Sequence, residues 1–175
     1  MTFIAGKLCE LRVLQATDHE VKTWTDAVMA GLTTQHLITG SVPMRYIYVR
    51  EVWEKERKAG DVLFGIWLHV DHPAPKSSPN IEGKYGAEWY DGPVRFIGSC
   101  GLHGHREIYR SWEARWLIFD ADAVGRGIGA EAVRLLTRYA FERLNTHRLW
   151  LGVSEDNTRA LKCYIDAGCK IEGRL

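Results

Sequence analysis

Three glycines occupy alternating positions in residues 124–130, whose sequence is Val-Gly-Arg-Gly-Ile-Gly-Ala. A short run of apolar and aromatic residues, 114–119, precedes this segment and is typical of a buried strand. Apolar residues at three- and four-residue intervals follow it to Leu144 and predict an amphipathic helix, with Glu131 on another face. Glycines let backbone N–H groups approach a ligand, and a helix start adds unpaired donors. The segment therefore predicts a cradle for a phosphate group, with a tight strand-to-helix connection as the alternative.

The spacing of the glycines excludes two common phosphate-binding motifs. A dinucleotide fingerprint needs Gly-x-Gly-x-x-Gly, but position 130 is Ala, and no acidic residue follows at the expected strand end. A nucleoside-triphosphate loop closes with Gly-Lys-Ser/Thr, whereas Gly129 is followed by Ala130 and Glu131. The predicted ligand is therefore a phosphate-bearing molecule that is bound by neither of these two motifs.

A second patterned segment begins after the strand-like residues 148–153. Its motif residues are Asn157, Ala160, Tyr164, Gly168 and the pair Glu172-Gly173. Together with the glycine segment, it makes residues 94–175 resemble the GNAT superfamily of acyl-CoA N-acyltransferases. The resemblance is strongest to the branch of ribosomal-protein N-terminal acetyltransferases and their small-molecule relatives. The first family motif, Arg/Gln-x-x-Gly-x-Gly/Ala, falls on residues 124–129.

The resemblance implies an enzyme that transfers an acetyl group from acetyl-CoA to a primary amine by direct attack on the thioester. The glycine segment would hold the pyrophosphate, and the preceding strand would pair with the pantetheine arm. The residues implied to bind the cofactor are Leu117, Ile118, Phe119, Val124, Gly125, Arg126, Gly127, Ile128, Gly129, Ala130 and Asn157. Tyr164 is the expected general acid, with a packed aromatic as its structural alternative. Asn157 is also expected to cap its helix.

Two positions depart from the family pattern. Val124 stands where the first motif has Arg or Gln, so backbone donors are expected to carry most of the grip on the pyrophosphate. Arg126 either compensates or is a solvated loop cation. Gly152 stands where many relatives carry a Glu that acts as the general base. A cofactor-binding module without catalytic activity therefore stays open as a second function.

The missing Glu leaves the general base to neighbouring strands. His103 and His105 near the end of one strand, and Glu113 at the start of the next, are the candidates. A histidine has a suitable ordinary pKa for this task. The alternative for each histidine is a turn-exposed or core imidazole without a catalytic role, and water could relay the proton instead. The cysteines at 163 and 169 have no partnered base in the local pattern, so a covalent acyl-enzyme is not expected.

Composition indicates one soluble domain spanning residues 1–175, with 46% hydrophobic residues and a net charge of +1. Neither a nucleic-acid surface nor a membrane span is expected, and the amino terminus lacks a signal-peptide layout, which predicts a cytoplasmic location. The four cysteines have no Cys-x-x-Cys spacing, so we expect reduced thiols and no metal.

The remaining patterns predict an antiparallel meander with helices inserted. Strands are expected at 8–14, 62–70, 94–102 and 112–119, and helices at about 18–30, after a Thr17–Glu20 capping box, and at 45–58. Residues 71–93 read as an exposed loop, and the resemblance places 31–43 beside the acceptor site. The implied fold is α/β (α+β): a mixed, mostly antiparallel sheet flanked by helices, with a central parallel strand pair splayed around the CoA arm.

The chain ends at Leu175, before the strand pair with which family members usually continue. A shorter sheet, strands from a partner chain, or a truncated chain would each explain this end. An uncovered strand edge invites pairing, so a homodimer is predicted. The acceptor amine stays open between a small molecule, such as an amino sugar, and a protein amino terminus; aromatics such as Trp67, Trp89 and Tyr90 are candidates to line a deeper pocket.

Overall fold

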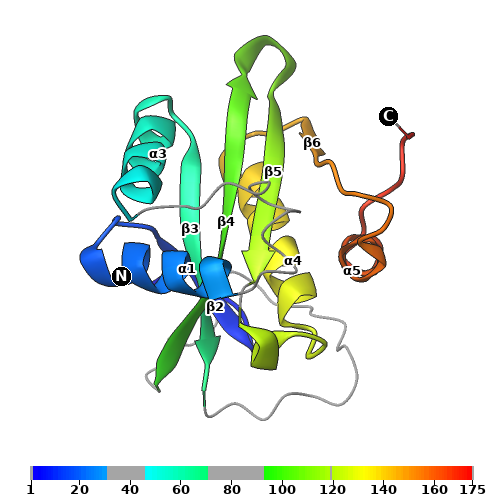
Figure 1. The fold of residues 1–175 in the computed structure, drawn as a ribbon. Helices are drawn as coiled ribbons and strands as arrows, with labels where there is room; N and C mark the ends of the chain where they lie inside the picture. Colours follow the sequence, from blue (N-terminus) through cyan, green and yellow to red (C-terminus); the bar gives the residue numbers. More distant parts are fainter. Residues whose placement is uncertain (1, 31–45, 71–92, 119, 175) are drawn as a thin grey trace.

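In a computed structural model, the described residues of the protein form one curled six-stranded sheet with helices on both faces (Figure 1). The structure describes residues 2–30, 46–70, 93–118 and 120–174. The strands are β1 (Thr2–Ala5), β2 (Cys9–Val13), β3 (Val62–His69), β4 (Val94–Arg106), β5 (Ser111–Ile118) and β6 (Arg148–Trp150). They lie in sequence order across the sheet, antiparallel from β1 to β5, and the β5/β6 pair is parallel.

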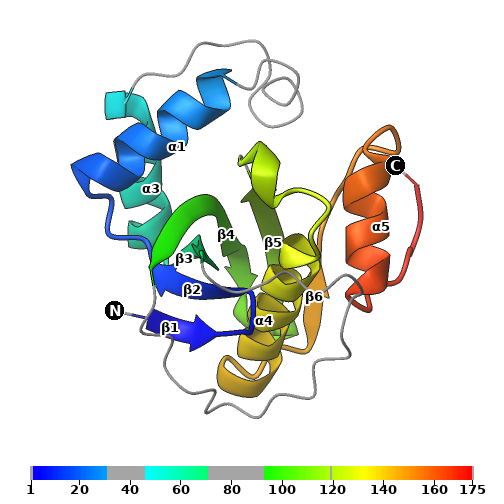
Figure 2. The same ribbon diagram turned by 90° about the horizontal axis from the view of Figure 1, so that it is seen from below.

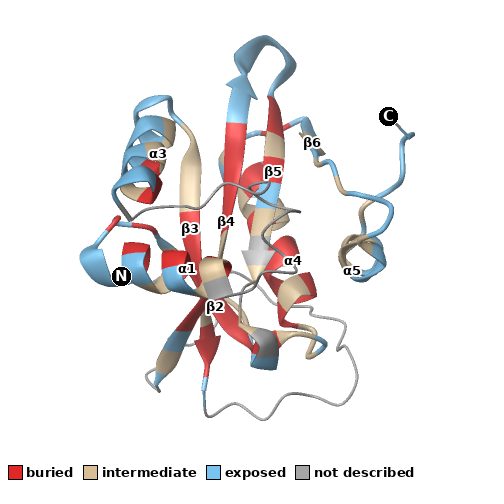
Figure 3. Ribbon diagram, viewed as in Figure 1, coloured by how far each residue is buried: buried red, intermediate tan, exposed pale blue. Residues whose placement is uncertain are grey.

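The helices divide between the two faces of the sheet, as Figure 2 shows from below. They are α1 (Asp18–Ala30), α3 (Tyr46–Lys58), α4 (Ile128–Arg143) and α5 (Thr158–Asp166). On one face α1 and α3 form a core with Trp24, Trp53 and Phe96. On the other face α4 packs Ile128 and Leu136 into the larger core (Figure 3). Alternate residues of each strand therefore face different helices.

Most predicted elements are confirmed, with changed ends. Strand β4 continues to Arg106, so the histidines at 103 and 105 lie within it rather than after it. Strand β6 stops at Trp150 instead of running to residue 153. Strand β1 was not predicted. The predicted loop at 71–93 lies outside the described residues except for its last position.

The start of α1 is held by the predicted capping box. The backbone N–H of Glu20 donates to Thr17 Oγ1 at 3.2 Å, and the N–H of Thr17 donates to Glu20 Oε2 at 3.0 Å. This reciprocal pair satisfies donors that a helix start leaves open. It fixes where the chain leaves β2 and crosses to the α1 face.

The position of Glu131 in α4 differs from the one that the helical pattern predicted. Its side chain was expected on a polar face, but only 1% of the residue is exposed. The carboxylate accepts N–H groups from Lys7, Leu8 and Cys9 at 2.9, 2.7 and 2.9 Å. Gly6 completes this contact, because a Cβ there would lie 2.6 Å from the Glu131 carboxyl carbon. The β1–β2 loop thus anchors the first turn of α4.

Candidate active site

The parallel pair β5/β6 opens after three residue pairs. Its last pair is Glu113 with Trp150, and β5 continues alone to Ile118. Among the described residues, this part of β5 pairs with β4 on one side only. Its free edge leaves backbone donors and acceptors unpaired in the direction of α5. An extended ligand with amide groups can pair with this edge as an added strand would.

The glycine segment lies at the far end of this open edge. Gly125 and Gly127 have φ angles of +78° and +79°, and Gly127 is the N-cap of α4. The first bond within α4 runs from the Glu131 N–H to the Gly127 carbonyl at 3.0 Å, so the N–H groups before it have no helical partner. Ile128 and Ala130 are buried and hold the turn against the core. These donors and the helix dipole make the turn suited to an anion.

Val124 and Arg126 add little to this turn. Val124 is half-buried, and Arg126 Nη1 donates to the Asp122 carbonyl at 3.5 Å, which directs it back along the chain. No Cβ at Gly125 would meet another atom within 4 Å, so the turn is open at this point. Gly129 is closer to its surroundings, since a Cβ there would lie 3.3 Å from Cys163 Sγ. The turn and α5 are therefore neighbours.

Tyr164 reaches the open edge of β5 from α5. Its ring packs against Trp116 with centroids 5.4 Å apart. Burial raises the pKa of Tyr164 to about 12, and the neighbouring thiols of Cys163 and Cys169 act in the same direction. Its hydroxyl has no hydrogen-bond partner within the part of the chain that the structure describes. A neutral phenol is thus held beside the place where the strands separate.

Asn157 caps α5, as predicted. Its Oδ1 accepts the N–H of Ala160 at 3.1 Å. The side-chain amide N–H₂ is the group left to bind a ligand. Asn157 positions the helix that carries Tyr164.

His103 lies on the face of the sheet opposite Tyr164, near the end of α3. Its Nδ1 is 3.1 Å from Asp61 Oδ2 and 3.7 Å from Glu56 Oε1. Asp61 is itself fixed, because its Oδ1 accepts the N–H of Gly104 at 3.0 Å. With Nδ1–H donating to this carboxylate, Nε2 carries the free lone pair. Nε2 lies over Gly101, where a Cβ would approach it to 2.7 Å.

The two other predicted bases are placed differently. Glu113 pairs directly with His103 across β4 and β5, but both of its oxygens accept bonds of 3.0 Å from Arg115. His105 stacks on Trp112 with centroids 4.3 Å apart. Trp112 faces the α4 side, so His105 is separated by the sheet from His103 and Glu113. Of the three, His103 is the one whose ring nitrogen is held by the carboxylate of Asp61.

Sequence reasoning missed Glu56, Asp61, Arg115 and Trp116. Glu56 and Asp61 meet His103, and Arg115 lies 4.0 Å from Glu56, only because β3, β4 and β5 pair, so no local spacing marks these residues. Burial raises the pKa of the Glu56 carboxyl, while His103 opposes this shift. The ligand atoms of Glu56, Asp61 and His103 lie within 4.8 Å of one another. The absence of a metal stays a prediction.

Several predicted site residues are not fully described. Phe119 and the predicted acceptor segment at 31–43 lie outside the described residues, as do Trp89 and Tyr90. Only the backbone of Leu117 is described, and it pairs with Ser99. Trp67 is a packing residue, with its ring 5.1 Å from that of Phe96 and under the Arg12 guanidinium.

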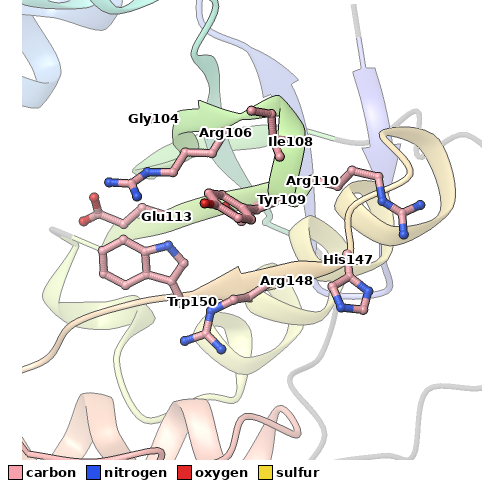
Figure 4. Close-up of a pocket in the computed structure, with 10 residues that line it drawn as sticks. Gly104, Arg106, Ile108, Tyr109, Arg110, Glu113, His147, Arg148 and Trp150 are labelled. Atoms are coloured by element: carbon pink, nitrogen blue, oxygen red, sulfur yellow. The ribbon is translucent and has the colours of Figure 1, made fainter.

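An open hollow of about 790 Å³ lies beside the last pair of the parallel ladder (Figure 4). It is formed by the β4–β5 turn and by β6. Its lining residues are Gly104, Arg106, Ile108, Tyr109, Arg110, Ser111, Glu113, His147, Arg148 and Trp150. The hollow therefore touches the point at which β5 and β6 separate.

Known proteins resemble this chain in both sequence and fold. A sequence model of the acetyltransferase (GNAT) domain matches residues 11–170. Spermidine N(1)-acetyltransferase of Escherichia coli strain K12 is 32% identical over 59 residues, which are 34% of this chain and only 32% of the relative.

Solved structures share the whole architecture. Spermidine N-acetyltransferase from Vibrio cholerae, in complex with CoA and spermine, has a TM-score of 0.71 at 18% identity, over 97% of this chain and 85% of that one. Aminoglycoside acetyltransferase AAC(6')-Ib in complex with coenzyme A has a TM-score of 0.70 at 14% identity, over 95% and 87% of the two chains. At these identities the likeness establishes the fold, including the mixed sheet and its parallel pair.

Helices long and apolar enough to cross a membrane are not found in the described segments.

Proposed function

Because this chain belongs to the GNAT acetyltransferase family, we propose that it transfers an acetyl group from acetyl-CoA to the primary amine of a small molecule. The observation that carries this proposal is the placement of Tyr164 beside the open edge of β5, at whose end lies the glycine turn. The curated relative and a structural neighbour are both named for a small polyamine, which favours a small-molecule acceptor over a protein terminus.

The residues of the turn fit a CoA pyrophosphate. A Cβ at Gly125 would meet nothing within 4 Å, so the segment is open to a ligand, and the N–H groups of Ile128, Gly129 and Ala130 lack helical partners. The unpaired edge of β5 at Leu117 and Ile118 would hold the pantetheine amides. Acetyl-CoA would supply the acyl donor as a thioester.

Side chains of this protein would accept and donate the protons in a direct acetyl transfer. Attack by the neutral amine forms the carbon–nitrogen bond, breaks the carbon–sulfur bond and leaves the electron pair on sulfur. The proton lost by the amine would pass through water to His103 Nε2, with Asp61 stabilising the charged imidazole. Such general-base assistance is worth about 10² to 10⁴ in rate.

Tyr164 would hydrogen-bond the leaving sulfur. A pKa of about 12 keeps its phenol protonated at neutral pH. A thiol has a pKa of about 8.5, so complete proton transfer from Tyr164 to sulfur is unfavourable. We therefore narrow the general-acid role implied by resemblance to that of a hydrogen-bond donor in the transition state.

The test is a thiol-release assay with acetyl-CoA and a panel of small primary amines, run beside a titration of CoA binding. Turnover of at least one amine, with acetylated product confirmed by mass, supports the proposal. CoA binding without turnover of any amine would favour the non-catalytic module instead. CoA bound away from residues 117–129 would overturn the assignment of the site.

A further inference from the structure

The hollow at the end of the parallel ladder is rich in cationic side chains. Its described lining includes three arginines and one histidine, but only one acid, Glu113. Both carboxylate oxygens of Glu113 are already bound by Arg115. An amine with a second cationic group would find no free carboxylate among the described lining residues.

Two of the three arginines have no anionic partner within the described segments. Arg148 pairs with both oxygens of Glu172, one of them at 2.8 Å. Arg110 donates to the neutral Asn145 Oδ1 at 3.0 Å, and Arg106 makes no ion pair with any residue that the structure describes. Figure 4 shows Arg106 beside Glu113, and Arg110 near His147 at the opposite end of the hollow. The uncompensated positive charge thus extends along the hollow.

Aromatic surface accompanies these charges. Tyr109 is 64% exposed and Trp150 is 43% exposed, and both line the hollow. An exposed indole in such a place can stack on the apolar face of a sugar or hold an alkyl chain. The hollow therefore offers contact area together with cations that suit a phosphate or a carboxylate.

The position of the hollow connects it with the reaction. The open edge of β5 leads from the glycine turn back toward Glu113, which forms the last ladder pair with Trp150. Both residues also line the hollow. An acceptor lying there would present one end to the separated strands and the other end to Arg110, at the opposite end of the hollow from Glu113.

From this arrangement we infer that the acceptor is a primary amine that also carries an anionic group, a phosphate or a carboxylate, rather than a polyamine. The inference rests on the proposed function and names the substrate class of that site. Arg110, at the opposite end of the hollow from Glu113, determines the specificity by binding the anionic group. The amine end lies toward Glu113 and Trp150.

The experiment compares amines in matched pairs that differ by the anionic group. Cadaverine is compared with lysine, and glucosamine with glucosamine 6-phosphate; spermidine is added as a polyamine. We expect kcat/KM to be at least about tenfold higher for the anionic member of one pair, and to fall as salt rises because the ion pairs are exposed.

Variants then separate specificity from general damage. Arg110→Gln should raise KM for the anionic amine about five- to tenfold and leave KM for the partner that lacks the anionic group unchanged. Arg57→Gln, an exposed residue of α3, is the matched control and should change neither. Equal use of both members, or preference for spermidine, would overturn this inference and leave the proposed function standing. No turnover of any amine would overturn both.

Discussion

The ring of Tyr164 packs against the ring of Trp116, with planes inclined by 42° and centroids 5.4 Å apart. This contact fixes the side chain of an α5 residue at the open edge of β5. Removing only the hydroxyl preserves the packing and isolates its chemistry.

Tyr164→Phe should lower kcat about 10- to 100-fold, because the leaving sulfur loses a hydrogen-bond donor in the transition state. The dissociation constant for CoA should stay within a factor of two of the wild-type value. Thiol release and calorimetric titration measure the two quantities. Tyr48→Phe, on the exposed side of α3, is the control. Unchanged kcat in Tyr164→Phe would remove Tyr164 from the mechanism.

The pH profile provides an independent check on the same residue. Tyr164 donates a hydrogen bond only while protonated, and burial raises its pKa to about 12. Its contribution is therefore present below that value and is lost only as pH rises toward it. Between pH 8 and 10 we expect the kcat profiles of the wild type and of Tyr164→Phe to run parallel, with no additional decline in the wild type. A decline in this range confined to the wild type would show an unshifted phenol.

His103→Gln should lower kcat/KM by about 10², the lower end of the range for a general base. His105→Gln is the matched control, because His105 stacks on Trp112 on the other face of the sheet and should be dispensable for catalysis. Initial rates with the amine well below its KM, at pH 7 and 9, make the comparison. Equal losses in the two variants would indicate a structural effect.

Asp61→Asn tests whether the carboxylate acts through His103. The amide can still bond to Nδ1, but it no longer stabilises a charged imidazole. We expect a smaller loss of kcat/KM than in His103→Gln, and no further loss in the double variant. Additive losses would show that Asp61 acts independently of the histidine.

Gly125→Ala should weaken CoA binding about tenfold, because its φ of +78° strains a residue with a Cβ by about 1–2 kcal/mol. Gly60→Ala is a close control: Gly60 lies in the turn after α3 with a φ of +89°, and a Cβ added there would meet no atom within 4 Å. Both variants should lose similar stability in urea. Only the first should change the dissociation constant for CoA.

Local patterns carried much of the sequence-based prediction. The glycine turn and the Thr17–Glu20 capping box depend on residues a few positions apart, and their spacing identified them. Glycines at positive φ and reciprocal caps leave such short-range signatures.

Contacts between strands left no comparable signature. Asp61 reaches His103 only because Val62 pairs with Leu102, and the sequence does not specify that register. The buried carboxylate of Glu131 was misassigned for the same reason. Helical periodicity placed it on a polar face, whereas its partners are backbone groups more than 120 residues earlier.

That carboxylate also bears on the order in which the protein assembles. Between β1 and the start of β2, the amides of residues 7–9 are bound by a side chain from α4. On a ribosome, these amides can find their partner only after α4 has been synthesised. Residues that emerge more than 100 positions before α4 therefore reach their final hydrogen bonds only when α4 docks, and the entropy cost of closing this long loop is incurred at that step.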